Sequence, residues 1–360
     1  MDTQNILDQA ISRLRDGETL SASIMSDSFR VIMSGKASDE QIKSFLVTLA
    51  VRIPTGEELF GATRVMRECV AGVALDSPET LLDTCGTGGA PKTFNVSTAA
   101  GIVSASCGAR VAKHGNVSRT GRGSAEVLER LGINIHASRS QQKLCLQNAG
   151  ICFCFAPKHH PAVAHVMRAR KQIGTPTIFN LLGPLTNPCS AGRQLLGVWD
   201  STFVTPIAEA LHSSGTTKSA VVHALDGLDE VSVSAPTRIM FVDRNGCTEK
   251  IISPEEFGLS TWNNNEVQAT TLNEATEIIS DVLYLGRGGA VRDMIIFSAG
   301  ISLFLADVSG DILSGVKMAS KSIDTGAAGE TLRAWVSISN TEAPSTDCMY
   351  THIYINNSSS

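Results

Sequence analysis

The sequence predicts an α/β protein in which a small all-helical N-terminal domain precedes a larger domain with a mostly parallel central sheet. Two observations carry this prediction. The first seventy or so residues show only helical periodicity, whereas from about Leu81 onward short apolar runs alternate with helical patterns. Strands that alternate with helices are typical of a parallel sheet. A chain of 360 residues that is 42% hydrophobic can bury a large core and is long enough for two domains.

The N-terminal domain is predicted to contain four helices. Apolar residues recur there at intervals of three and four, which is the spacing of one helical face. Ser38 and Gln41 have the spacing of a capping box and predict the start of the third helix. The four apolar stretches lie within 6–14, 24–33, 45–49 and 59–66.

The larger domain is predicted to alternate strands with helices, after a first apolar run that ends at Asp83. The further strands expected are 109–112, 151–155, 195–199 and 219–223. The helices expected are near 97–107, 124–131, 139–148, 203–213, 269–285, 290–306, 311–323 and 327–336, and 161–184 is helical in pattern as well. We therefore expect domains at 1–72 and 73–340. The turn-rich composition of 341–360 indicates a flexible tail.

Composition excludes several classes of protein. A formal net charge of −5 argues against broad nucleic-acid binding, which needs a concentrated basic surface. No apolar run approaches the length of a membrane span, and residues 1–17 form an amphipathic pattern with acidic residues rather than a signal peptide. We expect a cytoplasmic protein that binds neither nucleic acid nor membrane.

Nine scattered cysteines form no CxxC pair and do not indicate a disulfide framework. Cys152 and Cys154 fall on one face of a predicted strand, within the apolar run 151–155. A metal or redox pair is the alternative there, but free cysteines are usually buried as small hydrophobes. We interpret both as core residues.

Two glycine-rich segments indicate phosphate binding. Gly86-Thr87-Gly88-Gly89 follows the first apolar run and precedes Asn95-Val96-Ser97-Thr98, which opens a helix. Glycines let backbone N–H groups approach a ligand, and the first turn of a helix leaves its N–H groups unpaired. A second turn is predicted at Lys113-His114-Gly115-Asn116, beside Ser118, Arg119, Thr120, Arg122 and Ser124. Two such loops suit a ligand with phosphate at two places.

Further motifs follow these loops in a specific order. They include His160-Pro161-Ala162, Arg170, TIFNLLGPLTNP at 177–188, QLLGV at 194–198 and DGLDE at 226–230. With both loops, this set closely resembles the anthranilate phosphoribosyltransferase family, which belongs to the nucleoside phosphorylase-like (class III) phosphoribosyltransferases. The resemblance runs from about Ile6 to Val336. It implies the nucleoside phosphorylase/phosphoribosyltransferase-like fold, in which 160–186 joins the helical domain in space and faces the phosphate loops across a cleft.

The resemblance also implies a reaction and its site. The expected reaction transfers the phosphoribosyl group of phosphoribosyl pyrophosphate to anthranilate, with Mg²⁺ as cofactor, in a homodimer. The catalytic residues implied are Lys113, Asn116 and Arg170. Those implied for the donor are Gly86, Gly88, Gly89, Thr93, Asn95, Ser97, Thr98, Lys113, Ser118, Thr120 and Ser124. Those implied for the acceptor are Gly86, His114, Asn116 and Arg170, and those implied for the metal are Ser97, Asp229 and Glu230.

Simpler interpretations of some residues remain. An acidic pair beside a turn is often solvated surface, and Arg170 alone would be an ordinary helix-surface arginine. The chain also departs from the family pattern, because Ala90 replaces an aspartate, Val117 replaces an arginine, and both loops are one residue shorter. A related enzyme with another amine or base as acceptor, including a nucleoside phosphorylase-like one, and a noncatalytic ligand-binding homologue are therefore alternatives.

Overall fold

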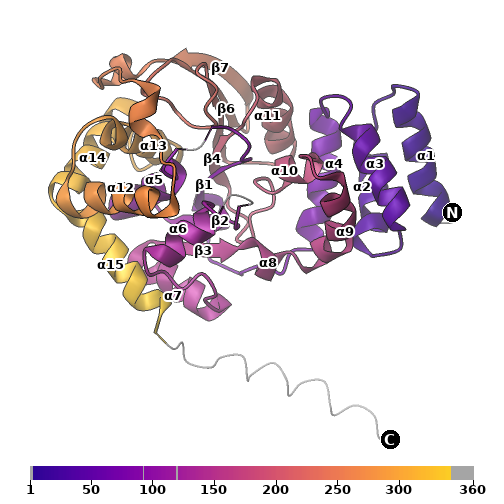
Figure 1. The fold of residues 1–360 in the computed structure, drawn as a ribbon, viewed down its shortest axis with the longest axis horizontal. Helices are drawn as coiled ribbons and strands as arrows, with labels where there is room; N and C mark the ends of the chain where they lie inside the picture. The colour runs from indigo at the N-terminus through magenta and orange to yellow at the C-terminus, as the bar shows by residue number, and fades with distance from the viewer. Residues whose placement is uncertain (1–2, 92, 119–120, 342–360) are drawn as a thin grey trace, which may run out of the picture.

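The computed structural model describes residues 3–91, 93–118 and 121–341. A bundle of N-terminal helices lies at one end of the molecule, a sheet lies in the middle, and the C-terminal helices lie at the other end (Figure 1). This arrangement confirms the predicted fold class, a helical domain followed by a larger α/β domain with a mostly parallel sheet.

All four predicted N-terminal helices are present. The last three of them begin at capping residues, as the sequence indicated for the third helix. Ser38 accepts a hydrogen bond from the backbone of Gln41, whose side chain accepts one in return, and Thr55 and Glu58 repeat this capping box one helix later. The helices are α1 (Thr3–Arg15), α2 (Ala22–Met33), α3 (Asp39–Leu49) and α4 (Gly56–Glu68).

The central sheet has seven strands in the order β3-β2-β1-β4-β5-β6-β7. The first five strands in this order run parallel, and β6 and β7 each pair antiparallel with the strand before them. The hairpin of β6 and β7 was not predicted: β7 is exposed over most of its length and lacks an apolar pattern, and the available signals, the apolar run 239–242 and Asn245-Gly246, were missed. The strands are β1 (Leu82–Gly86), β2 (Val111–Gly115), β3 (Ile151–Phe155), β4 (Arg193–Gly197), β5 (Lys218–Ala224), β6 (Thr237–Asp243) and β7 (Gly246–Ile252).

The second predicted turn requires a correction. Lys113 and His114 lie within β2, not in a turn, because β2 stays paired with β3 as far as Gly115 opposite Phe155. The strand therefore starts later and ends later than the expected 109–112. Since β1 ends at Gly86, the two strands finish at the same edge of the sheet and bring both glycine-rich segments there.

Helices cover both faces of the sheet. On one face, α5 (Val96–Ser106) packs against β1 and β2, and α13 (Ala290–Leu305) packs against α5 and β4. On the other face, α11 (Val204–Ser213) packs against β5, β6 and α4, so it links the sheet to the helical bundle. Five further helices of the α/β domain are α6 (Ser124–Arg130), α7 (Arg139–Ala149), α12 (Leu272–Leu285), α14 (Ile312–Asp324) and α15 (Ala327–Ser339), with short 3₁₀ turns between elements.

The segment 161–184 is not one continuous helix. It contains α9 (Ala164–Ile173) and α10 (Ile178–Leu182), preceded by the short helix α8 (Ala156–His159). Gly174 adopts a left-handed backbone with φ of 72° and ends α9, and Pro176 follows it. Because α9 packs against α2 and α3, and α10 against α4, this part of the chain lies with the helical bundle.

Two expectations concern membranes and the C-terminal tail. Of the helices described, none alone has the length and apolar composition of a membrane span, and only α12 and α13 taken together, bent by 76° at their junction, pass that test. The predicted flexible tail at 341–360 lies outside the described residues except for Thr341.

Candidate active site

The first glycine loop leaves the end of β1 in a conformation that requires glycine. Gly88 and Gly89 have φ of 65° and 109°, values that other residues rarely adopt. A Cβ atom on Gly89 would lie 3.2 Å from the ring of Trp199. The backbone N–H and the hydroxyl of Thr87 both donate to the carbonyl of Gly197. Strand β4 thus fixes the loop, which leads to the start of α5.

Lys113 projects from β2 into the space between β1 and α5. Its side chain is 1% exposed, and Nζ donates to the carbonyl of Thr84 and, at 3.2 Å, to Oγ of Ser97. Burial lowers the pKa of Lys113, while the charges of Asp83 and Glu230 act in the opposite direction. The amine of Lys113 is therefore held at the predicted donor site by two elements and lies near two acidic side chains.

The acidic pair that follows β5, Asp229 and Glu230, lies beside Gly86 and Ser97. A Cβ atom on Gly86 would lie 3.2 Å from Oδ2 of Asp229, and the backbone N–H of Ser97 donates to Glu230. Burial and the charge of Asp229 raise the pKa of Glu230 to about 8, although Lys113 opposes them and the side chain keeps some contact with solvent. The acidic pair is thus not an isolated surface feature.

The residues present fit a magnesium ion. The hydroxyl of Ser97 and the carboxylates of Asp229 and Glu230 come together from two parts of the chain, around Lys113 and Gly86. Hydroxyl and carboxylate oxygens are the ligands that Mg²⁺ prefers, together with water and phosphate. The mutual repulsion that raises the pKa of Glu230 is the kind that a divalent cation relieves.

The start of α5 offers further groups to a ligand. The Thr98 side chain is fully buried, and its hydroxyl has no hydrogen-bond partner within the described part of the chain. A buried hydroxyl of this kind is usually satisfied by some partner. Asn95 caps the helix with a φ of 66°, and its side-chain amide donates to the carbonyl of Arg122. Thr93 forms a single β-bridge with Gln268.

The second loop, after β2, is held by a carboxylate. The backbone N–H groups of Ser118 and Gly123 both donate to the side chain of Glu126. The hydroxyl of Ser118 accepts from the backbone of Arg122. Ser124 begins α6 so close to β2 that a Cβ atom on Gly115 would overlap its Oγ. The predicted donor residue Thr120, with Arg119, lies outside the described residues.

The predicted acceptor residues lie on both sides of the domain boundary. Nε2 of His114 is 3.2 Å from Nε2 of His160, which precedes α9. Burial lowers the pKa of His114 well below its ordinary value and that of His160 to about 4, so both rings are neutral near pH 7. Asn116 is exposed, with Oδ1 accepting from the next backbone N–H. Arg170 lies on α9, with its guanidinium 5.2 Å from the ring centroid of Phe179.

Sequence reasoning missed a buried polar network beside the site. Oδ1 of Asp83 accepts from the backbone N–H of His114, and Oδ2 accepts from the amide of Asn187 at 2.8 Å. Burial raises the pKa of Asp83 to about 6, against the attraction of Lys113. A charged residue inside an apolar strand was the available signal. His160 and Asn187 stood in the quoted motifs, but no role was given to either.

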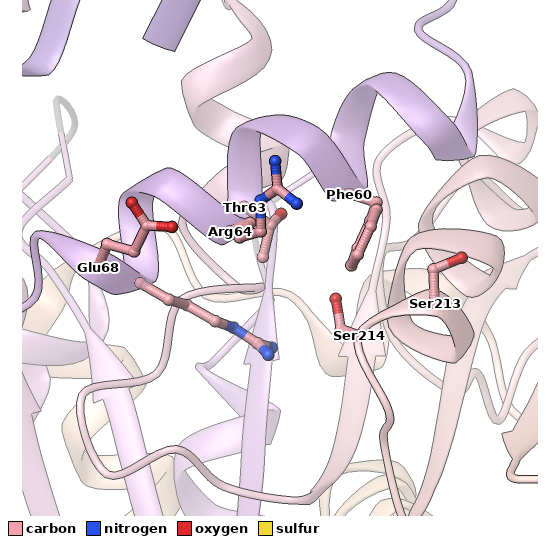
Figure 2. A pocket seen from close by; sticks show the side chains of 7 residues that line it. Phe60, Thr63, Arg64, Glu68, Ser213 and Ser214 are labelled. Carbon is pink, nitrogen blue, oxygen red and sulfur yellow. The ribbon is translucent and has the colours of Figure 1, made fainter. Parts of the chain in front are cut away.

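A separate cavity lies away from these residues. It measures about 410 Å³ and lies between α4 and the end of α11 (Figure 2). Its lining combines arginine, hydroxyl and aromatic side chains, and none of them was predicted as a site residue. The lining residues are Phe60, Thr63, Arg64, Arg67, Glu68, Ser213 and Ser214.

Comparison with known proteins gives consistent matches over nearly the whole chain. Residues 8–70 match the helical bundle domain of the glycosyl transferase family, and residues 78–329 match its a/b domain. The chain is 41% identical to the anthranilate phosphoribosyltransferase of Thioalkalivibrio sulfidiphilus, over 92% of this chain and 98% of that protein. It is 42% identical to that of Rubrobacter xylanophilus, over 93% and 98%.

Solved structures agree with these matches. The anthranilate phosphoribosyltransferase of Thermus thermophilus has a TM-score of 0.86 at 32% identity, over 92% of this chain and 99% of that one. A Saccharomyces cerevisiae anthranilate phosphoribosyltransferase in complex with PRPP and Mg has a TM-score of 0.81 at 26% identity, over 92% and 97%. The same yeast enzyme with 4-fluoroanthranilate is equally similar, with a TM-score of 0.81.

Proposed function

Since this chain belongs to the anthranilate phosphoribosyltransferase family, we propose that it transfers the phosphoribosyl group of phosphoribosyl pyrophosphate to anthranilate. The products are N-(5-phosphoribosyl)anthranilate and pyrophosphate, and the reaction belongs to tryptophan biosynthesis. One observation carries the proposal for the site: Ser97, Lys113 and the pair Asp229-Glu230 converge beside the first glycine loop. This grouping is what a pyrophosphate leaving group requires.

The reaction breaks the bond between the anomeric carbon and the pyrophosphate oxygen, and the amine nitrogen of anthranilate forms the new bond to that carbon. The amine then loses a proton. Negative charge develops on the departing pyrophosphate, and fixed donors there contribute about 3–4 kcal/mol each. We assign this role to Lys113 and to the N–H groups of Gly86, Gly88 and Gly89. Both positive-φ glycines let the backbone approach the ligand.

We assign the metal to Ser97, Asp229 and Glu230. When bound, Mg²⁺ supplies positive charge to the pyrophosphate oxygens. The yeast relative in complex with PRPP and Mg supports this choice of ion. The remaining predicted donor residues, Thr93, Asn95, Thr98, Ser118, Thr120 and Ser124, are assigned to the phosphate groups; the orphaned hydroxyl of Thr98 supports its inclusion.

We assign the acceptor to Arg170, His114 and Asn116. A guanidinium fork suits a carboxylate, and the carboxylate of anthranilate requires such a partner. Arg170 lies on the helical side of the molecule and His114 on the sheet side, and the contact of His114 with His160 links the two. The yeast relative in complex with 4-fluoroanthranilate supports an aromatic amine acid as acceptor.

We also propose that two copies pair through the helical domain. Val47 and Val51, at the end of α3, are 46% and 83% exposed and present apolar surface there. A twofold pairing is the commonest closed assembly. We further propose that the chain divides into a helical domain at 1–72 and an α/β domain at 73–340. We also propose a cytoplasmic location.

The decisive experiment follows the fluorescence of anthranilate. The protein is mixed with anthranilate, phosphoribosyl pyrophosphate and magnesium, and the fluorescence should fall as the amine is substituted. Omitting the donor is the control for photobleaching and binding. A constant signal with folded protein, at saturating concentrations of both substrates, would refute the proposed activity.

A further inference from the structure

Three cysteine side chains meet in the core of the α/β domain. Cys152 and Cys154 lie two residues apart on the same face of β3, and Cys189 comes from the connection that precedes β4. Their sulfur atoms all lie within 4.8 Å of one another, and the sulfurs of Cys154 and Cys189 are 3.4 Å apart. All three side chains are at most 2% exposed. Sequence reasoning treated the first two as core hydrophobes and missed the third.

The spacing of the sulfurs suits a soft metal ion. A thiolate lies about 2.3 Å from a bound d¹⁰ ion such as zinc, which places neighbouring sulfurs about 3.8–4.0 Å apart in tetrahedral or trigonal geometry. The separation of 3.4 Å between Cys154 and Cys189 is slightly shorter than this range, and no two of the three sulfurs are more than 4.8 Å apart. Within the described part of the chain, no fourth histidine, cysteine or carboxylate ligand atom joins the group. Structural zinc almost always has four ligands, whereas soft thiolates also select copper(I).

We propose that Cys152, Cys154 and Cys189 form a three-sulfur binding site for copper(I). The ion lies among the three sulfurs and forms one bond to each. Every thiol that becomes a ligand loses its proton to solvent, and no electron is transferred, because copper enters and stays in its reduced state. The site is distinct from the oxygen ligands assigned to magnesium.

The three thiols differ in acidity: hydrogen bonds to neighbouring sulfurs and burial raise the pKa values of Cys152 and Cys154 well above their ordinary value. Hydrogen bonds from Cys152 and Cys154, together with the charge of His159, lower the pKa of Cys189 against the effect of burial. A bound copper(I) ion carries one positive charge, so it offsets one of the three thiolate charges when it binds.

The cluster is joined to the candidate active site by two hydrogen bonds. The backbone N–H of Cys189 donates to Oδ1 of Asn187 at 2.8 Å, and Nδ2 of Asn187 donates to Asp83 at 2.8 Å. Asp83 in turn accepts from the backbone of His114. If the proposed function holds, copper(I) loading should therefore change the affinity for anthranilate. Binding of copper itself is tested without either substrate, so the two proposals fail independently.

The test is a competition for copper(I) under anaerobic, reducing conditions. The full-length protein is titrated into the coloured copper(I) complex of bicinchoninate, and loss of colour measures the copper withdrawn. We expect one tightly bound ion per chain. Cys154→Ser and Cys189→Ser should each weaken binding by about 100-fold or more, since even changes outside the ligand set cost ~10–100-fold. The matched control is Cys247→Ser, because Cys247 is an exposed cysteine on β7.

A second measurement uses the unmodified protein and does not depend on the folding of any variant. Cysteine alkylation during partial unfolding in urea is mapped by mass spectrometry, with and without copper(I). Protection of Cys152, Cys154 and Cys189, but not of Cys247, is the expected result. Equal alkylation in both samples, or equal copper affinity in the two variants and the wild type, overturns the site. Cysteine-dependent retention of zinc in preference to copper overturns the choice of metal.

Discussion

At the scale of single residues, Glu230 connects folding to catalysis. Burial and the charge of Asp229 raise its pKa to about 8 in the folded protein, from an ordinary value of 4.5. Between these values the folded, metal-free protein keeps a proton that the unfolded chain has lost. The contribution of this group to stability is therefore present at low pH and is lost as the pH rises through this window. Ionised Glu230 suits a metal ligand. Without the metal, the same buried negative charge lowers the free energy of unfolding.

We expect Glu230→Gln to stabilise the metal-free protein while nearly abolishing turnover. The variant should be more stable than the wild type, and this difference in the free energy of unfolding should grow by about 1–3 kcal/mol between pH 5 and pH 8. The reason is that each unit of pKa shift is worth about 1.4 kcal/mol. Urea denaturation without magnesium measures it. Glu277→Gln, on an exposed position of α12, is the control. A difference that is independent of pH would show that Glu230 is ionised in the folded state.

Arg170 tests the assignment of the acceptor. Arg170→Ala should weaken anthranilate binding by about 1.5–3 kcal/mol, the usual contribution of a hydrogen bond to a charged group, and leave donor binding nearly unchanged. Calorimetry with each ligand separates the two. Arg168→Ala is a matched control, since Arg168 lies on the same helix, is 79% exposed and pairs with Asp39. Equal losses for donor and acceptor would mean that Arg170 holds the two parts of the molecule together.

The site residues proposed from the sequence are mostly ones that share a local motif. Gly88 and Ser97 belong to one strand, loop and helix start, a layout that local spacing in the sequence can indicate. Asp83, His160 and Cys189 have partners more than thirty residues away along the chain. Their approach depends on strand order and on the path of a connection, neither of which a local pattern contains.

At the scale of elements, the break between α9 and α10 was visible in the sequence as Gly174-Thr175-Pro176, although 161–184 was predicted only as a helical stretch, without this break. A left-handed glycine ends a helix, and a proline shortly after it prevents continuation. The hairpin of β6 and β7 was indicated only by the apolar run 239–242 and Asn245-Gly246. Most of β7 faces solvent, so its residues carry no apolar alternation that could have indicated a strand.

Gly174 offers a test of how strongly this break is fixed. Gly174→Ala should lower the free energy of unfolding by about 1 kcal/mol, because its φ of 72° is unfavourable for a residue with a Cβ atom. No heavy atom lies within 4 Å of that Cβ, so a steric clash would not contribute. Chemical denaturation measures the change. Gly288→Ala is the control, because its Cβ also meets open space but its φ is not left-handed. Equal stability of the two variants would contradict the prediction.

At the scale of the whole molecule, the helical bundle and the sheet share a core. One continuous apolar cluster includes Phe29 and Phe45 of the bundle together with Leu196 and Val221 of the sheet. The periodicity of the sequence indicated two domains but not this shared cluster, because a pattern shows which face of a helix is apolar and not which partner covers it. A second apolar cluster fills the other face of the sheet.

The exposed valines at the end of α3 test the proposed pairing of two copies. Val47→Glu places a charge where an apolar contact between copies is proposed, and burying an unpaired charge is costly. Light scattering should give about twice the chain mass of 38.1 kDa for the wild type and a mass near 38.1 kDa for the variant. Ile251→Glu, on the 61% exposed Ile251 of β7, should keep the mass of the pair. If Val47→Glu pairs as tightly as the wild type, the interface does not lie at α3. If the wild type is monomeric at every concentration, the proposed pairing is wrong.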